Sequence, residues 1–210
     1  AEAANRYKGR FAAAAVHDLL QPLNAARMFA AGLRARLRDD ETRRLADNID
    51  GALSAQDGIL ASLLDISRLE TGTLRTDIRE VALGPLLDGL ARETGVLAQA
   101  RGLRFDHVPT RAWVRSDATL LRRLVQNFLS NAVRYTARGR IVLGVRRDGD
   151  RLWIEVHDTG PGIPPNRQRE IFEEFRRLDD GNAGDRGAGL GLAIVDRIAR
   201  LLGHRIDLRS

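Results

Sequence analysis

The chain has 210 residues, of which 43% are hydrophobic and 30% are charged, as in an ordinary globular protein. It has no cysteine, which excludes disulfides and thiolate metal sites, and no apolar run nears the roughly 18 residues of a membrane span. The formal net charge of +6 favours acidic partners, yet the arginines are interleaved with acidic residues and aromatic residues make up only 5%. This pattern disfavours nucleic-acid binding and leaves nucleotide phosphates or an acidic protein as candidate partners.

Two amphipathic helices are predicted in residues 5–70, because apolar side chains recur there at steps of three and four. Residues 38–42 form the only polar break, so the two helices should make an antiparallel hairpin. One hairpin cannot bury both apolar stripes, whereas two hairpins make a closed four-helix bundle. We therefore expect a homodimer, with packing of the hairpin on the rest of the chain as the alternative.

The first of these helices carries a histidine and an aspartate side by side, His17 and Asp18, within FAAAAVHDLLQPL. Helical geometry puts His17 and Gln21 beside the apolar stripe, at the edge of the bundle. A solvent-facing imidazole can act as a nucleophile when a carboxylate such as Asp18 accepts or holds its other proton. Pro22 removes one helical hydrogen bond and should bend the helix beside the histidine. A surface histidine is more often inert, so an unreactive His17 is the alternative.

A second region with mixed helix and strand patterns follows the stop signal at residues 71–73. We expect a first domain over residues 1–70, a linker over 71–77 and a second domain over 78–210. Helical patterns occur at 84–101, 117–136 and 190–202, with a shorter one near 166–174; strand-like patterns occur at 77–82, 103–108, 111–115, 140–147, 151–158 and 204–209. Turns between strands, such as residues 147–150, imply an antiparallel or mixed sheet, so an α+β sandwich with the helices on one face is predicted.

One polar stripe of the helix at 117–136 holds Asn127, Asn131 and Arg134. Asparagine oxygens suit Mg²⁺, which binds through few protein ligands together with substrate phosphates. Arg134 could hold a phosphate, and Tyr135 could stack on a flat ring. An ordinary solvated helix face is the alternative.

The predicted strand at 151–158 ends in Asp158, on the same face as the apolar residues of that strand. A carboxylate at such a place is costly unless it is paired. Gly160 and Gly162 allow the backbone of the following turn to approach a ligand closely. A partly buried aspartate beside this turn suits the amino group of a purine, and an ordinary strand-ending turn is the alternative.

A glycine-rich segment containing Gly187, Gly189, Leu190 and Gly191 opens the last predicted helix. Free N–H groups and the positive end of the helix dipole favour an anion at this point. Because no strand precedes the segment, a dinucleotide-binding fingerprint is disfavoured, and the lack of a GxxxxGK[ST] run excludes a P-loop.

Five segments in this order resemble the signature boxes of bacterial two-component sensor histidine kinases. They are HDLLQPL, QNFLSNAVRYT, DTGPGIP, IFEEF and GAGLGLAIV, and the resemblance extends over nearly the whole chain. It implies a dimerisation and histidine-phosphotransfer bundle followed by a Bergerat-type ATP-binding domain. The variant HDLLQPLNAAR is similar to a subgroup often found in hybrid kinases.

The resemblance also implies a role for each matched residue. His17 would accept the phosphoryl group with help from Asp18, and Asn127 would support the phosphate end of ATP. The residues implied in ATP binding are Asn127, Asn131, Arg134, Tyr135, Asp158, Gly160, Gly162, Gly187, Gly189, Leu190 and Gly191, with Asn131 as the Mg²⁺ ligand and residues 176–189 as a mobile lid. Asp18 and Gln21 replace the Glu and the Thr or Asn that are commonest in the family. The change at Gln21 leaves phosphatase activity open.

The function implied is autophosphorylation of His17 by ATP, followed by transfer to an aspartate of a response-regulator receiver domain. A catalytically silent dimeric scaffold and an ATPase of the same nucleotide fold that works as a clamp are the alternatives. We expect a cytoplasmic location, and tethering to the inner membrane through upstream segments stays open.

Overall fold

The structure is a computed structural model, and it describes residues 76–168, 170–173 and 190–210 together with scattered positions between 22 and 60. The chain divides into two compact units, residues 1–75 with 181–190 and residues 76–180 with 191–210. The expected linker at 71–77 spans the junction of these units in the sequence. Its exact limits stay a prediction.

In the first unit, the positions described between 22 and 33 and between 42 and 60 are helical. Asp39 lies at a bend, and its carboxylate accepts a hydrogen bond from the backbone N–H of Thr42 at 3.3 Å. A side-chain acceptor three residues before a helical N–H is an N-cap arrangement, which starts a helix at this point. A bend at Asp39 therefore lies within the predicted break, while Thr42 already belongs to the second helix and the limits of the break stay a prediction.

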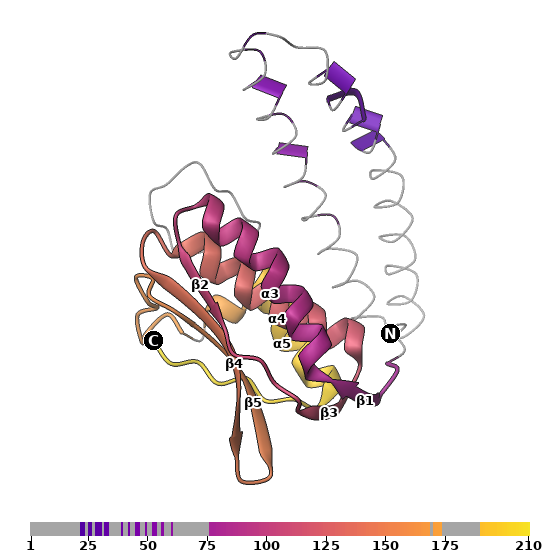
Figure 1. Cartoon of the computed structure of the whole chain (residues 1–210), viewed down its shortest axis with the longest axis vertical. Helices are drawn as coiled ribbons and strands as arrows, with labels where there is room; N and C mark the ends of the chain where they lie inside the picture. The colour runs from indigo at the N-terminus through magenta and orange to yellow at the C-terminus, as the bar shows by residue number, and fades with distance from the viewer. Residues whose placement is uncertain are drawn as a thin grey trace. The chain divides into compact units, whose positions relative to one another are not determined.

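The second unit is a sheet covered by helices on one side (Figure 1). Its elements in chain order are β1 (Arg79–Ala82), α3 (Leu83–Ala100), β2 (Arg104–His107), β3 (Trp113–Ser116), α4 (Ala118–Tyr135), β4 (Arg140–Asp148), β5 (Arg151–Asp158), a short 3₁₀ helix η1 (Glu170–Phe172) and α5 (Gly191–Leu202). The main sheet has the order β2-β4-β5, in which β2 is parallel and β5 antiparallel to β4, while β1 and β3 form a separate antiparallel pair. The prediction of a mixed sheet in an α+β sandwich is confirmed.

The helix boundaries follow from caps that the sequence encodes. The carboxylate of Asp117 accepts the backbone N–H groups of Thr119 and Leu120 at 2.9 and 3.0 Å and so begins α4. At the end of α3, Gly102 has a φ of 69°, its N–H donates to Gln99, and the N–H of Leu103 donates to Ala98. This pair of bonds around a left-handed glycine is a Schellman motif, and Gly203 ends α5 in the same way.

The core lies between the helices and the inner face of the main sheet. Ile141 and Leu143 of β4 are fully buried against Leu83 and Leu87 of α3 and Leu129 of α4, all in one apolar cluster. Burial of each such side chain stabilises the fold by about 1.5–3 kcal/mol. The cluster therefore fixes α3 and α4 across the sheet and holds the C-terminal part of α4 close to the end of β5.

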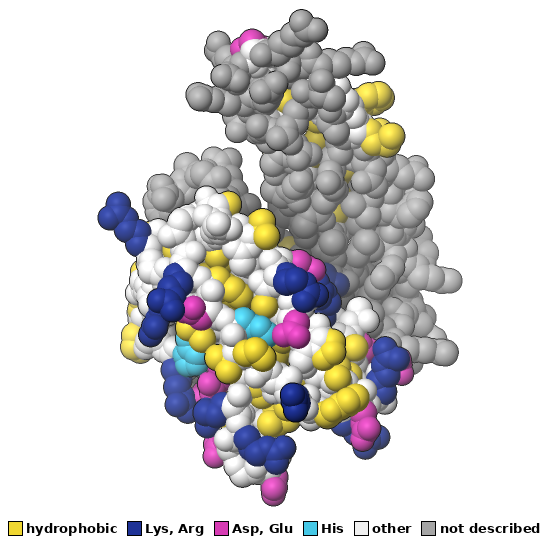
Figure 2. All heavy atoms as spheres, viewed as in Figure 1, with side chains coloured by type: hydrophobic (Ala, Val, Ile, Leu, Met, Phe, Trp, Pro, Cys, Tyr) yellow, Lys and Arg dark blue, Asp and Glu magenta, His cyan; other side chains and the backbone are white. Residues whose placement is uncertain are grey.

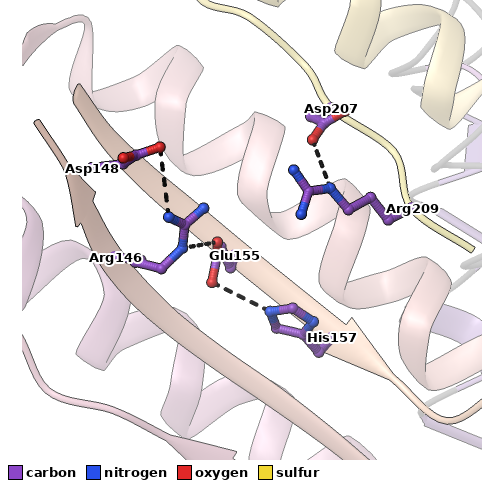
Figure 3. Close-up of polar contacts among 6 residues, drawn as sticks. All are labelled: Arg146, Asp148, Glu155, His157, Asp207 and Arg209. Atoms are coloured by element: carbon purple, nitrogen blue, oxygen red, sulfur yellow. Dashed lines mark hydrogen bonds and ion pairs between the residues drawn. The ribbon is translucent and has the colours of Figure 1, made fainter.

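The opposite face of the main sheet carries a group of charged and polar side chains that contact one another (Figure 3). Arg146 of β4 donates to Glu155 of β5 at 2.7 Å, and the second oxygen of Glu155 lies 3.3 Å from His157 Nε2. The hydrogen bond from Arg146 is the main cause that lowers the pKa of Glu155. Beyond α5, Arg209 donates to Asp207 in the segment that ends the described chain.

Arginine side chains are distributed over the face of the molecule drawn in Figure 2, with acidic and apolar side chains between them. No single dense basic patch is visible among the coloured, described residues on that face.

Two predicted elements are wrong. Residues 204–209 form no strand, although exposed and partly buried side chains alternate along them as they would in one. An extended segment becomes a strand only when its backbone joins a ladder, and the period of the sequence does not report the partner. The expected helix near 166–174 is a turn at 165–168 and the short 3₁₀ helix η1 in the described part, because only Ile171 there is buried.

Within the described part of the chain, none of the helices has the length and apolar content that crossing a bilayer requires.

Candidate functional site

The predicted polar stripe lies in the C-terminal half of α4, where Asn127, Asn131 and Arg134 are all partly buried. The Nδ2 atom of Asn127 donates to the carbonyl oxygen of Arg123 one turn earlier, at 3.0 Å. This bond fixes the amide plane and leaves the Oδ1 atom of Asn127 as an acceptor for another group.

The first residue of α5 lies against this amide. A Cβ atom on Gly191 would come within 2.9 Å of Asn127 Oδ1, closer than real Cβ contacts allow. A residue with a Cβ atom at this position would therefore require the Asn127 amide or the start of α5 to shift. The N-terminal N–H groups of a helix have no partners inside it, so α5 presents donors and a positive dipole end beside Asn127.

Asp158 ends β5 and lies next to the residue that follows α4. Its Oδ1 atom accepts the N–H of Gly160 at 2.8 Å and lies 3.5 Å from the hydroxyl of Thr136, at the outer limit of a hydrogen bond. A Cβ atom on Gly160 would approach Asp158 Oδ1 to 2.7 Å and the carbonyl oxygen of Tyr135 to 3.3 Å. The close approach of this turn to the end of α4 therefore depends on glycine.

The expectation of a partly buried Asp158 is wrong, because its side chain is exposed. The alternation of β5 does put it on the face of Ile154 and Val156, which pack on the core. However, β5 ends at Asp158, and the chain leaves the sheet there, so the carboxylate lies at the rim of the sheet.

The turn after β5 is held at several points. Thr159 exchanges two hydrogen bonds with Arg140, because its N–H donates to the Arg140 carbonyl at 3.2 Å and its hydroxyl accepts the Arg140 N–H at 3.0 Å. Gly162 has a φ of 73°, a left-handed conformation that favours glycine. Gln168 donates to the carbonyl oxygen of Ile163 at 3.1 Å. These bonds hold the glycine turn next to Asp158.

Two residues at this rim were not selected from the sequence. Thr136 is 2% exposed and places its hydroxyl 3.5 Å from Asp158 Oδ1, and Thr159 anchors the turn. Both directly follow a predicted site residue, Tyr135 or Asp158. A search for hydroxyl side chains immediately after the ends of a helix and a strand would have found them.

Of the remaining predicted site residues, only Tyr135 and Leu190 lie in the described part of the chain. Tyr135 is 49% exposed at the end of α4, and Leu190, just before α5, is buried. The residues that fall outside the described part of the chain are His17, Asp18, Gln21, Gly187, Gly189 and the expected lid at 176–189. Their roles stay predictions, as do the ligand contacts of the described residues.

The donor set also bears on the expected metal. Among the residues that the structure describes, no group of three or more histidine, cysteine or acidic side chains could form a metal site. Asn131 alone is a weak site, so a cation there would need oxygens from a bound nucleotide. That requirement fits Mg²⁺, which keeps waters and binds substrate phosphates.

Two family models match the chain. Residues 7–72 match the His Kinase A (phospho-acceptor) domain, and residues 116–210 match the histidine kinase-, DNA gyrase B- and HSP90-like ATPase. The second match begins with the last residue of β3 and contains α4, the turn after β5 and α5.

Curated proteins and solved structures agree with these models. The chain is 32% identical to the aerobic respiration control sensor protein ArcB and 31% identical to the sensor protein TorS, both of Escherichia coli. These alignments cover 100% of this chain but only 28% of ArcB and 23% of TorS. Full-length ShkA, solved in complex with AMPPNP, has a TM-score of 0.73 at 28% identity, over 92% of this chain and 41% of that chain. AdeS of Acinetobacter baumannii, with a TM-score of 0.57 at 19% identity over 88% of this chain and 86% of that chain, supports the fold alone.

Proposed function

Because this chain belongs to the sensor histidine kinases, with both a phospho-acceptor and an ATPase-type domain, we propose that it transfers the γ-phosphoryl group of ATP to His17. The observation that carries the proposal is the convergence of three elements. Asn127 of α4 meets Gly191 of α5, and Asp158 of β5 meets Thr136 at the end of α4.

These two contacts suit the two ends of one nucleotide. The free N–H groups of α5, the Oδ1 atom of Asn127 and the guanidinium of Arg134 would bind the phosphates. Asp158 can accept a hydrogen bond from the exocyclic amino group of adenine, and Tyr135 can pack on the purine ring. Gly187, Gly189 and Leu190 would continue the phosphate-binding segment before Gly191, and Gly160 and Gly162 would shape the adenine end.

Asn131 and the nucleotide phosphates would hold Mg²⁺, which supplies charge neutralisation to phosphoryl transfer. We expect that chelation with EDTA stops phosphorylation of the wild type and that added Mg²⁺ restores it.

In the proposed reaction, a ring nitrogen of His17 attacks the γ-phosphorus. The N–P bond forms as the bond to the leaving oxygen of ADP breaks, and Asp18 accepts the proton from the other ring nitrogen. Most of the barrier is lowered by positioning and charge neutralisation, so few reactive side chains are needed.

A homodimer is part of the proposal. Leu33, Leu45 and Ile49, which the sequence assigns to apolar stripes, are 51%, 57% and 48% exposed in a single chain. Contiguous apolar side chains on a surface favour burial against a partner, and a second hairpin would close a four-helix bundle.

The phosphoryl group on His17 would then pass to an aspartate of a receiver domain. The relatives are named as sensor proteins and are much longer than this chain, which supports a place in a two-component pathway and leaves the other domains open. Membership of the hybrid subgroup, a receiver as partner and a cytoplasmic location belong to this proposal.

The test is incubation of the chain with ATP labelled at the γ-position. We expect acid-labile label on the wild type, none on His17→Ala, and a wild-type level on His157→Ala. His157 is a matched control because its side chain is 68% exposed and its Nε2 atom lies 3.3 Å from Glu155, on the sheet face opposite the core.

Other outcomes would favour the alternatives. ATP binding without label would favour a catalytically silent scaffold, and ATP hydrolysis without label would favour a clamp ATPase. If His17 is labelled, mixed dimers of His17→Ala and Asn131→Ala subunits show whether the phosphoryl group comes from the same subunit or from its partner. Neither variant subunit has both the acceptor His17 and the proposed Mg²⁺ ligand, so label in the mixture requires transfer between subunits.

A further inference from the structure

We infer that Arg101 is a positioning residue for the nucleotide site, acting through the last turn of α4. The inference rests on the proposed function, since it concerns the same ATP site. Arg101 follows α3, and its guanidinium reaches across to the carboxyl end of α4.

The C-terminus of α4 lacks the usual means of satisfying its last carbonyl groups. The final carbonyls of a helix have no partners inside it, and many helices supply them through a left-handed glycine. Here the residue after α4 is Thr136, in extended conformation, and its N–H reaches only the Ala132 carbonyl. Arg101 Nη1 instead donates to the carbonyl oxygens of Val133 at 3.2 Å and Arg134 at 3.3 Å.

The cation of Arg101 also suits this position electrostatically. The carboxyl end of a helix carries a partial negative charge, and a nearby guanidinium stabilises it. Hydrogen bonds from a charged donor are roughly twice as strong as bonds between neutral groups. One side chain thus supplies two bonds and the counter-charge at the end of α4.

The backbone of Arg101 is itself fixed by the Schellman motif that ends α3. Its N–H donates to the Ala98 carbonyl at 3.0 Å, and the next residue, Gly102, has a φ of 69° that favours glycine. Ala98 is fully buried and Leu103 is 6% exposed, so the turn is tied to the core on both sides. Arg101 therefore reaches α4 from a rigid base.

The end of α4 passes this restraint to the adenine side of the site. The two bonded carbonyls belong to the residues just before Tyr135 and Thr136. The Tyr135 carbonyl faces Gly160, and the Thr136 hydroxyl lies 3.5 Å from Asp158. If the last turn of α4 frays, the groups that hold Asp158 and the glycine turn move with it.

The test compares Arg101→Gln with Arg101→Lys and with a matched control, Arg122→Gln. Arg122 also links α3 and α4 through a charged bond, with Nη2 at 2.6 Å from Glu93 Oε1, but it lies in the N-terminal part of α4. The measurements on the full chain are the Kd values of ATP and GTP by calorimetry, the Tm, and the KM and kcat of autophosphorylation.

We expect Arg101→Gln to raise the Kd and the KM for ATP about fivefold, with little change in kcat and a smaller change in the Kd of GTP. Arg101→Lys should restore most of the ATP affinity, because an ammonium group can also donate to the carbonyls. Arg122→Gln should lower the Tm to a similar degree and leave the Kd of ATP within about twofold of wild type.

Equal loss of ATP affinity in Arg101→Gln and Arg122→Gln would reduce Arg101 to a general stabilising contact and overturn the inference. So would wild-type ATP affinity in Arg101→Gln. Both results leave the proposed kinase function standing, since the wild type still binds ATP. A wild type that binds no ATP overturns the proposed function and the role of Arg101 together.

Discussion

Gly191 begins α5 at a point where a Cβ atom would lie only 2.9 Å from Asn127 Oδ1. The Asn127 amide cannot simply turn away, because its Nδ2 atom is bonded to the Arg123 carbonyl. A methyl group on residue 191 must therefore displace the start of α5 or break that bond. Either change moves the donors that we propose for the phosphates.

We predict that Gly191→Ala raises the Kd of ATP about tenfold, the cost of one or two strained or lost charge-assisted hydrogen bonds. The matched control is Gly95→Ala in α3, where a Cβ atom would lie 3.8 Å from Phe105, an ordinary contact. That helix-interior change should stabilise the fold by about 0.5–1 kcal/mol and leave ATP affinity unchanged. Calorimetric titration and urea unfolding measure both quantities, and unchanged ATP affinity in Gly191→Ala would remove Gly191 from the site.

For single residues, the sequence predicts which residue types suit the site better than it predicts which residues contact one another. The sequence predicts Asn127, Asp158 and Gly191 as site residues because an amide, a carboxylate and a glycine suit a nucleotide. In the fold, Gly191 lies beside Asn127 of α4, and Asp158 lies beside Thr136, which follows α4. Thr136 and Arg101 were missed because their partners lie 22 and 32 residues away in the chain. No local pattern reports such a pairing, since it depends on how α3, α4 and β5 pack.

The boundaries of α3, α4 and α5 were predictable because the residues that cap these helices are adjacent to them in the sequence. Asp117 before α4, Gly102 after α3 and Gly203 after α5 cap these helices, and the predicted ranges agree with the observed ones to within one residue at each end. The strand expected at 204–209 failed for the opposite reason, because a strand needs a partner that lies elsewhere in the chain. Its alternating pattern is present, but the ladder is not.

The Asp117 cap should make the stability of the fold depend on pH. Burial raises the pKa of Asp117, but the N–H groups of Leu120, Asp77 and Thr119 and the charge of Arg79 outweigh it and lower that pKa below its ordinary value of 3.8. A carboxyl group with a lowered pKa in the fold contributes stability above its unfolded value, and this contribution is lost as the pH falls through the folded value.

We therefore expect Asp117→Ala to lower the free energy of unfolding by about 1–2 kcal/mol at pH 7, and by progressively less as the pH falls below 3.8. The control is Asp77→Ala, which removes an exposed carboxylate 3.7 Å from Arg79 and should cost less than about 1 kcal/mol. Urea unfolding followed by circular dichroism across this pH range measures both. A cost that does not depend on pH would show that the charge of Asp117 is not what the cap uses.

At the scale of the whole molecule, the exposed apolar side chains of the first unit bear on assembly. Ile49 is 48% exposed in one chain, although its position in the repeat predicts burial. We predict that Ile49→Glu converts a dimer of twice 23.2 kDa into a monomer in sedimentation equilibrium, because an unpaired carboxylate is costly in an apolar interface.

The control for assembly is Val96→Glu, which charges an even more exposed apolar residue, 68%, on α3 of the other unit. This variant should stay dimeric. A monomeric wild type, or equal dissociation of both variants, would contradict the proposed four-helix bundle.

The proposed function requires that the site formed by α4, β5 and α5 transfers a phosphoryl group to one of the four histidines in the chain. Tandem mass spectrometry at neutral pH, after incubation with ATP and Mg²⁺, identifies the modified residue. We expect phosphate on His17 and unmodified His107, His157 and His204. Phosphate on one of those three instead, or consumption of ATP with His17 unmodified, would overturn the proposed kinase function.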